Sequence, residues 1–217
     1  MATDYANLLN PERARIFRII HRSNLPWVLE HGLHCGNSAT RSPQWVSIGN
    51  QELIAKRASW PVRAGPGGVL NDYVPFYFTP FSPMMLAIRT GWNGVQQHRP
   101  QDILILVSDL HRISALGLTW LFTDTHANNG VVRYFQRVED LAQLDWRILQ
   151  QRDFRRDPDD PGKFGRYQAE VLVHRQVPLQ GLSGIVCADD DGKMLVEQAV
   201  AAAGERLQVA TRPGWYL

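Results

Sequence analysis

One carboxylate in this sequence enters an apolar run, a position from which it could do chemistry. Glu170 follows Gln168-Ala169 and leads into Val171-Leu172-Val173. Desolvating a carboxylate is costly, so such a residue usually has a partner or a task. Side chains alternate along a strand, so Gln168 and Glu170 would point into one cleft, where they suit a sugar with vicinal hydroxyls. From this segment alone, an edge-strand glutamate solvated on its outer face is the alternative.

Other catalytic signatures are absent from the chain. The sequence contains no HExxH, GxSxG or P-loop motif. Its seven histidines include no helical i, i+4 pair, and Cys35 and Cys187 form no CxxC pair. The sequence therefore predicts no metal centre and offers no support for an unrelated hydrolase.

Composition indicates an ordinary globular protein. The 217 residues are 44% hydrophobic and carry a net charge of +2, which by itself does not demonstrate nucleic-acid binding. The chain opens with no cationic-then-apolar stretch, so we expect no signal peptide, and no apolar run approaches the roughly 18 residues of a membrane span. We expect a single domain over residues 1–217, cytoplasmic and monomeric, with no membrane contact and no disulfide.

The hydrophobic pattern predicts an α+β domain with a split, mostly antiparallel sheet flanked by short helices. After a polar lead-in at 1–14, strands are expected at 16–20, 73–78, 103–107, 118–122, 168–174 and 184–187, and just before Trp215. Pro75 suits an edge or a bulge of its strand. Helices are expected from Asn24 to Gly32, at 50–58, from Ser82-Pro83, at 137–150 and at 193–203, with a charged loop at 151–166.

The first expected strand and helix resemble those of poly-ADP-ribose polymerase-like ADP-ribosyltransferases. The matching residues are Arg18-Ile19-Ile20-His21, Asn24-Leu25, Val28-Leu29 and Gly32-Leu33. Arg18 stands where that family has a histidine. This is a departure from the family pattern, and His21 is the candidate to take part of the missing histidine's role.

Several further blocks, in one order, resemble the DarT family of DNA ADP-ribosyltransferase toxins. They are Pro66-Gly67-Gly68-Val69-Leu70, Asp72 to Phe78, Ser82-Pro83-Met84, Phe122-Thr123-Asp124, Leu141 to Trp146 and Gln168-Ala169-Glu170. The resemblance runs from about residue 15 to the C-terminus without large gaps.

The DarT resemblance implies a fold, an activity and a partner. The fold is a pair of packed sheets with an NAD cleft between them. The activity is sequence-specific transfer of ADP-ribose from NAD to a base in single-stranded DNA, thymine in the better-matching branch. The partner is a macrodomain antitoxin that removes the mark. Guanine in DNA, RNA or a protein side chain are the alternative acceptors; intact Arg57 and Glu170 argue against a protein that only binds.

Breaking the bond between nicotinamide and ribose creates an oxocarbenium-like sugar, for which Glu170 is the candidate stabiliser. The resemblance places Arg57, nine residues before Pro66, at the family's catalytic arginine. An arginine stays protonated, so we expect an electrostatic role for Arg57, with Glu170 assisting removal of the proton from the thymine ring. Without the resemblance, Lys56-Arg57 would be interpreted as a solvated helix face.

The remaining candidates fall into two groups. Residues expected to contact NAD are Arg18, Ile19, Ile20, His21, Asn24, Arg57, Tyr77 and Ser82, with Tyr77 or Phe78 against the nicotinamide ring. Residues expected to contact DNA are Lys56, Met84, His126, Arg166 and Tyr167, the last three in a target-recognition loop at roughly 126–169. Within it, the stretch 151–166 mixes five cations with four aspartates.

Overall fold

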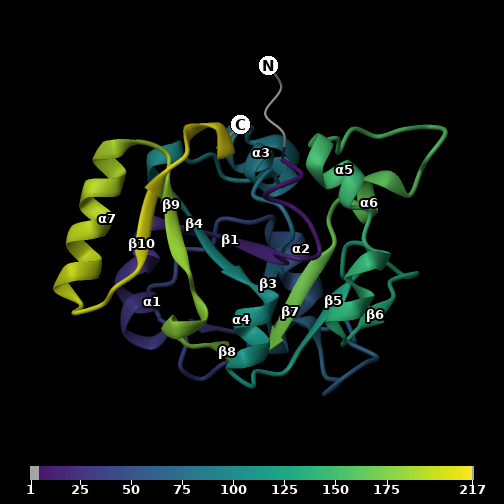
Figure 1. The fold of residues 1–217 in the computed structure, drawn as a ribbon, viewed down its shortest axis with the longest axis horizontal. Helices are drawn as coiled ribbons and strands as arrows, with labels where there is room; N and C mark the ends of the chain where they lie inside the picture. The colour runs from purple at the N-terminus through teal and green to yellow at the C-terminus, as the bar shows by residue number, and fades with distance from the viewer. Residues whose placement is uncertain (1–4, 217) are drawn as a thin grey trace.

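A computed structural model describes residues 5–216, so the first four residues of the expected polar lead-in lie outside the described part of the chain. Eight strands form one sheet in the order β10-β9-β4-β1-β3-β7-β5-β6 (Figure 1). Their bounds are β1 Arg15–His21, β3 Tyr73–Tyr77, β4 Ile103–Asp109, β5 Trp120–Thr123, β6 Tyr134–Phe135, β7 Glu170–His174, β9 Gly184–Cys187 and β10 Gln208–Thr211. Neighbours are antiparallel except β9 and β10.

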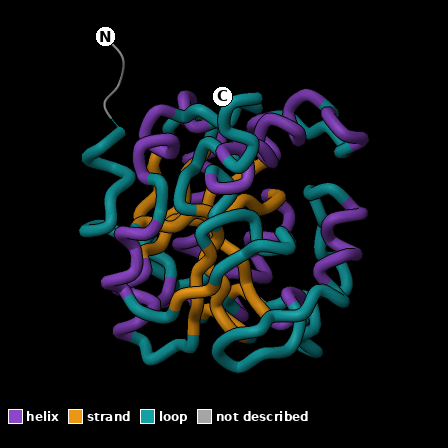
Figure 2. The backbone as a smooth tube through the Cα atoms, turned by 90° about the vertical axis from the view of Figure 1, so that its right-hand side faces the viewer, coloured by secondary structure: helices purple, strands orange, loops and turns teal. Residues whose placement is uncertain are grey.

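Helices surround this sheet, and the strands gather at the centre of the molecule (Figure 2). The helices are α1 Leu25–His31, α2 Gln51–Arg57, α3 Pro83–Thr90, α4 Leu110–Ala115, α5 Trp146–Gln151, α6 Lys163–Arg166 and α7 Asp190–Ala202. A second sheet pairs β2 Leu33–His34 with β8 Gln176–Val177. Because β4 is buried from Ile103 to Ser108, it forms the centre of the hydrophobic core.

The large sheet divides between β1 and β3. These strands share a single register pair, Phe17 with Tyr77, whereas β1 pairs with β4 over seven residues and β3 with β7 over five. Beyond that pair the two halves diverge and a cleft opens, which confirms the predicted split sheet. Pro75 lies where β3 has lost its β1 neighbour, so the missing N–H removes no ladder hydrogen bond on that side.

Local signals fix where several helices begin and end. The side chains of Ser82 and Asn50 accept from the backbone N–H groups of Met85 (3.2 Å) and Leu53 (3.0 Å), so they cap α3 and α2. Gly32 ends α1 at a φ of 76°, and a Cβ there would lie 2.5 Å from the carbonyl oxygen of Val177. The helix α2 has no buried residue, so interactions at its ends must hold it.

Two expected elements differ in the structure. The helix expected at 137–150 is broken into a 3-10 helix, Val138–Gln143, and α5, because Asp145 caps α5 through the N–H of Ile148 at 3.4 Å. The strand expected from residue 168 begins at Glu170, since the Gln168 and Ala169 N–H groups bond back to Gly165 and Arg166. The short helices α4 and α6 were not predicted.

Candidate active site

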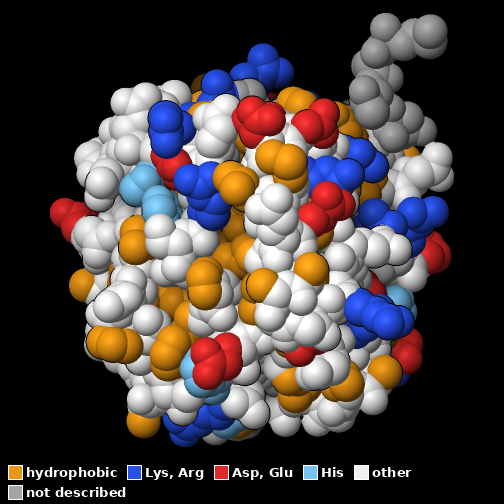
Figure 3. Space-filling model, turned by 90° about the vertical axis from the view of Figure 1, so that its left-hand side faces the viewer, with side chains coloured by type: hydrophobic (Ala, Val, Ile, Leu, Met, Phe, Trp, Pro, Cys, Tyr) orange, Lys and Arg blue, Asp and Glu red, His pale blue; other side chains and the backbone are white. Residues whose placement is uncertain are grey.

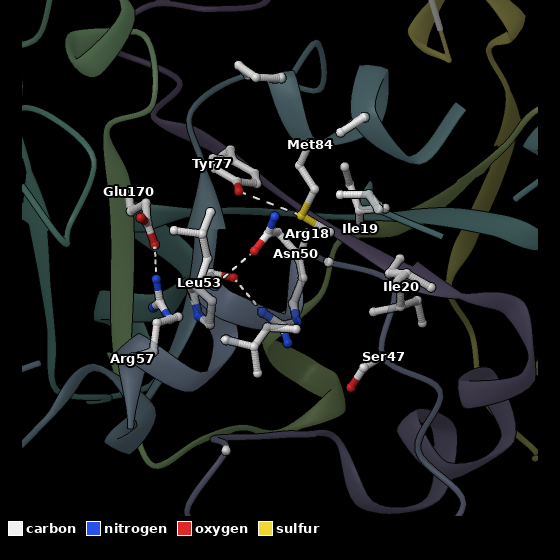
Figure 4. Close-up of a pocket in the computed structure, with 18 of the residues that line it drawn as sticks. Arg18, Ile19, Ile20, Ser47, Asn50, Leu53, Arg57, Tyr77, Met84 and Glu170 are labelled. Carbon is white, nitrogen blue, oxygen red and sulfur yellow. Dashed lines mark hydrogen bonds and ion pairs between the residues drawn. The ribbon is translucent and has the colours of Figure 1, made fainter. Parts of the chain in front are cut away.

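A cavity of about 340 Å³ opens where β1 and β3 diverge. Its wall combines residues of β1, the 34–57 segment, β3, α3 and the chain leading into β7. Figure 4 draws Arg57 and Glu170 on one side of this cavity and Ile19 and Ile20 on the other. Elements from distant parts of the sequence therefore meet in one cavity.

The central feature of the cavity is an ion pair. Arg57 Nη1 lies 3.0 Å from Glu170 Oε2, and the two side chains are only 14% and 2% exposed. The other carboxylate oxygen, Oε1, accepts from the Ala127 N–H at 3.2 Å and lies 3.8 Å from His126 Nε2. The backbone N–H of Glu170 donates to Thr123 Oγ1 at 3.0 Å, which fixes the start of β7. Hydrogen bonds from its backbone N–H and to both of its carboxylate oxygens therefore fix the position of Glu170.

These contacts keep the carboxylate charged. Burial raises the pKa of Glu170, but Arg57, then His126 and the Ala127 N–H, outweigh burial and hold that pKa below its usual range. Arg57 has a second nitrogen, Nη2, that is buried and has no hydrogen-bond partner among the described residues. A buried donor without a partner is costly, so this one is available to a ligand in the cavity.

Arg18 contributes a second cation from β1. Its Nη1 donates to the Pro75 carbonyl at 2.8 Å across the opening between β1 and β3, and its Nε is buried without a partner in the described structure. Burial, and then repulsion from Arg57, lower the pKa of Arg18 to about 10, so it remains protonated at neutral pH. Arg18 also reaches a smaller hollow shared with Trp27, His34, Gly36, Arg41 and Trp45.

Aromatic and amide side chains complete the wall. Tyr77 donates to Met84 Sδ at 3.7 Å, and both residues line the cavity. Burial raises the pKa of the Tyr77 phenol, so this group stays neutral. Asn24 bonds twice to the backbone of Val46: Nδ2 donates to its carbonyl and Oδ1 accepts from its N–H, each at 2.9 Å. Asn24 thereby attaches the 45–50 segment of the wall to the start of α1.

The structure brings together most of the predicted site residues. Those that line the cavity are Arg18, Ile19, Ile20, Asn24, Arg57, Tyr77, Met84, His126 and Glu170. Gln168 also lines the cavity, although it precedes the strand rather than belonging to it. His126 bonds through Nδ1 to Asn128, so its ring orientation is set from the side away from Glu170.

Five predicted residues are placed elsewhere. Lys56 is exposed on α2, and His21 accepts from the Ser23 N–H beside His98. Ser82 is fully buried as the cap of α3, and Tyr167 is buried with its hydroxyl on the Phe81 carbonyl at 2.9 Å. Arg166 is bound to Asp160 (2.6 Å) and Asp145 (3.2 Å). None of these five lies among the residues of the cavity wall.

Sequence reasoning missed much of the wall between residues 34 and 57. Arg41, Trp45, Ser47, Asn50 and Leu53 line the cavity, as do Arg156 and Phe164 near β7. The available signal was a tryptophan and an arginine in a stretch without helical or strand periodicity, where no predicted element accounts for them.

The described residues contain no group of three or more His, Cys, Asp or Glu side chains able to hold a metal ion. Among the same residues, no helix combines the length and apolar character needed to span a bilayer.

Comparisons with known proteins agree with this geometry. The model of a family described as ssDNA thymidine ADP-ribosyltransferase, DarT, matches residues 17–217. A DNA ADP-ribosyl transferase of Escherichia coli O127:H6 is 50% identical over 216 residues, covering 100% of this chain and 99% of the relative.

Two solved structures of DarT from Thermus sp. 2.9 are also similar. One, in complex with ADP-ribosylated ssDNA, has a TM-score of 0.88 at 33% identity and covers 95% of this chain and 98% of that one. The other, in complex with NAD+, has a TM-score of 0.82 at 34% identity and covers 95% and 99%.

A split sheet with a buried arginine–glutamate pair in its opening, in a chain with these relatives, defines an ADP-ribosyltransferase. The chain belongs to the DarT family. It is an NAD-dependent DNA ADP-ribosyltransferase, with NAD as the ADP-ribose donor.

Proposed function

We propose that this enzyme transfers ADP-ribose to a thymine base of single-stranded DNA, within a preferred sequence, and that it acts as the toxin of a toxin–antitoxin pair. The observation that carries the proposal is the Arg57–Glu170 pair, 3.0 Å apart in the cavity between β1 and β3. The match of residues 17–217 to the thymidine-modifying family supports the choice of base.

NAD would lie along the β1 side of the cavity. The backbone of Ile19 and Ile20 would read the nicotinamide amide, and the Tyr77 ring would lie against the nicotinamide ring. Arg18 keeps an unpartnered Nε donor and a positive charge, so it suits the diphosphate. Tyr77 is the register partner of Glu170 between β3 and β7, so a nicotinamide ring against Tyr77 would have its bond to ribose near Glu170.

Glu170 would act on the ribose. Its charged carboxylate would accept a hydrogen bond from the 2′-hydroxyl and stabilise positive charge as the bond from the anomeric carbon to nicotinamide breaks. Unit charges about 4 Å apart, at an effective dielectric of about 20, interact by roughly 4 kcal/mol, or about three powers of ten in rate. Nicotinamide leaves with the electron pair of that bond.

Arg57 would act on the acceptor. A ring nitrogen of thymine becomes a nucleophile only as it loses its proton, so charge develops on the flanking carbonyl oxygens. The free Nη2 of Arg57 can donate to such an oxygen, while Glu170 accepts the proton. A new bond then joins the anomeric carbon to the thymine nitrogen, and the proton passes from Glu170 to solvent.

The acceptor is tested with NAD and short single-stranded oligonucleotides that differ by one base, the products being read by mass. We expect one ADP-ribose on thymine-containing strands only, within a sequence context that the same series defines. Transfer to guanine, to RNA or to added protein instead would show that the acceptor is one of the alternatives.

The toxin role is tested in cells. We expect expression of the wild-type chain to arrest growth, Glu170→Gln to be harmless, and co-expression of a macrodomain hydrolase to restore growth.

Both substrates, DNA and NAD, are available in the cytoplasm, where we propose that the enzyme works. One core cluster extends from Leu9 to Tyr216, which supports a single-domain enzyme.

A further inference from the structure

The segment between α5 and β7 supplies a second edge to the cavity. Arg156, Phe164 and Gln168 from this segment line the same cavity as Glu170. The NAD contacts proposed above come instead from β1 and β3. This edge, residues 152–168, is therefore a part of the cavity wall that the proposed NAD contacts leave unused, and it is available to an acceptor.

Most cations of the 152–168 edge already have partners. Lys163 and Arg155 lie 2.6 and 3.2 Å from Asp153, and Arg166 lies 2.6 Å from Asp160. Arg152 covers the ring of Phe81 at 4.0 Å, away from the cavity wall. These cations are neutralised locally or packed, so they offer little net charge to a ligand.

Arg156 differs from its neighbours. It is exposed, it lines the cavity, and it makes no hydrogen bond or ion pair with another described residue. Its guanidinium carbon lies 5.2 Å from the ring centroid of Phe164, which also lines the cavity. The aromatic face holds the guanidinium by a cation–π contact and leaves its N–H groups unused.

We propose that Arg156, supported by Phe164, binds a backbone phosphate of the DNA strand next to the modified base. An unpaired guanidinium held over an aromatic ring is suited to a phosphate of a single strand, since its fork matches two phosphate oxygens. Such a contact would be valuable, because the neighbouring cations are paired with carboxylates and the net charge of the chain is only +2. The face drawn in Figure 3, on the other side of the molecule from α5 and α6, offers no large basic patch either, since cations and carboxylates are interspersed on it. The inference rests on the proposed DNA acceptor.

The test compares Arg156→Gln with Arg155→Gln under steady-state conditions, using NAD and a thymine-containing oligonucleotide. Arg155 is the matched control, since it is one residue away and exposed but is paired with Asp153 and absent from the cavity wall. For Arg156→Gln we expect the KM for the oligonucleotide to rise about tenfold, the size of one charge-assisted contact, with kcat and the KM for NAD within about twofold of wild type. Arg155→Gln should behave as wild type.

Salt dependence gives an independent readout of the same contact. Loss of one phosphate contact should reduce the slope of log affinity against log salt by about 0.7 for a single strand. Phe164→Leu keeps the apolar packing but removes the aromatic face, so we expect a smaller rise in the KM for the oligonucleotide, about threefold. An unchanged salt slope in Arg156→Gln would overturn the proposal.

A double-mutant cycle, which combines the Arg156 substitution with a modified DNA linkage, identifies the phosphate. Oligonucleotides carrying one neutral methylphosphonate linkage, on either side of the thymine, remove a single charge from the DNA. With wild-type enzyme one linkage should raise the KM about as much as Arg156→Gln does, and with Arg156→Gln the same linkage should have no further effect. If every linkage raised the KM of Arg156→Gln by the same factor as that of wild type, the assignment would be wrong.

Two further results would also contradict the inference, and they are distinguishable. If Arg156→Gln raised the KM for NAD and left that for DNA unchanged, the phosphate bound by Arg156 would be that of the dinucleotide. If wild-type enzyme transferred nothing to DNA, the proposed function itself would fail, whereas equal behaviour of the Arg156 and Arg155 variants on a modified strand would remove only the inference.

Discussion

Arg57 and Glu170 lie 113 positions apart in the chain, yet Arg57 Nη1 and Glu170 Oε2 meet at 3.0 Å. One residue ends a helix without buried residues, and the other begins a buried strand. The pair therefore ties the exposed helix α2 to the central sheet. It also places a charged carboxylate, with a buried guanidinium against it, in the opening of the sheet.

Replacement of Glu170 should abolish transfer without abolishing NAD binding. We expect Glu170→Ala to lose on the order of 10²–10⁴ in turnover, because the developing positive charge on the ribose loses its counter-charge. Calorimetric titration should still detect NAD. Glu170→Gln, which keeps the shape of the side chain, is the control for unfolding. Near-full activity in either variant would rule out the assigned role.

Arg57→Lys tests whether the fork of the guanidinium matters or only its charge. A lysine can keep the ion pair with Glu170 but cannot also offer the second donor that Arg57 holds in Nη2. We expect a fall in kcat of about tenfold to a hundredfold at saturating NAD and DNA, with folding retained. Oligonucleotide modification followed by mass under steady-state conditions would measure this, and wild-type rates would show that charge alone suffices.

Asn24 has a positioning role that a substitution can expose. Its two hydrogen bonds of 2.9 Å to Val46 hold the 45–50 segment, which carries part of the cavity wall. Asn24→Ala should raise the KM for NAD about tenfold and affect the KM for DNA less, since each bond contributes about 1 kcal/mol. Asn24→Asp keeps the Oδ1 acceptor but loses the donor, so its KM for NAD should lie between those of wild type and Asn24→Ala. Equal effects on both substrates would contradict this assignment.

The sequence predicts the central pair better than it predicts the wall. Glu170 stands out because desolvating a carboxylate in an apolar run is costly, so the residue must have a partner or a task. Arg57 is identified through the resemblance to the DarT family, by its distance from Pro66. His21 lies three residues from Arg18 on a strand, and an odd separation places two side chains on opposite faces. Alternation alone would therefore have separated them.

Tertiary contacts decide the rest of the site. Arg166 and Tyr167 were expected at the DNA. Arg166 is bound by Asp160 of the same charged loop and by Asp145, and Tyr167 by the carbonyl of Phe81, which the sequence pattern does not bring near. Conversely, Arg41 and Trp45 stand in a stretch with no periodicity, so no element could be assigned to position them. Strand positions were predictable because burial repeats along them, as in β4.

The pH dependence of stability should report the charged state of Glu170. Its pKa in the folded protein is held below the usual value of 4.5, so its contribution to stability is fully present above pH 4.5 and is lost as pH falls through the folded pKa. Urea unfolding of wild type and Glu170→Gln between pH 7 and about pH 3 should show the stability difference narrowing below pH 4.5. A difference that widens on acidification would contradict the sign of the shift.

Two tyrosines of one small apolar cluster offer a matched test of hydrogen-bond energetics. The Tyr134 hydroxyl is buried with no partner among the described residues, whereas the Tyr73 hydroxyl donates to the Gly67 carbonyl at 2.7 Å. Removing an unpaired buried hydroxyl relieves desolvation, so Tyr134→Phe should leave the free energy of unfolding unchanged or raise it by up to about 1 kcal/mol. Tyr73→Phe should lower it by about 1 kcal/mol, because the Gly67 carbonyl loses its donor. Urea denaturation of both variants measures the contrast, and a larger loss in Tyr134→Phe than in Tyr73→Phe would show that the Tyr134 hydroxyl has a partner after all.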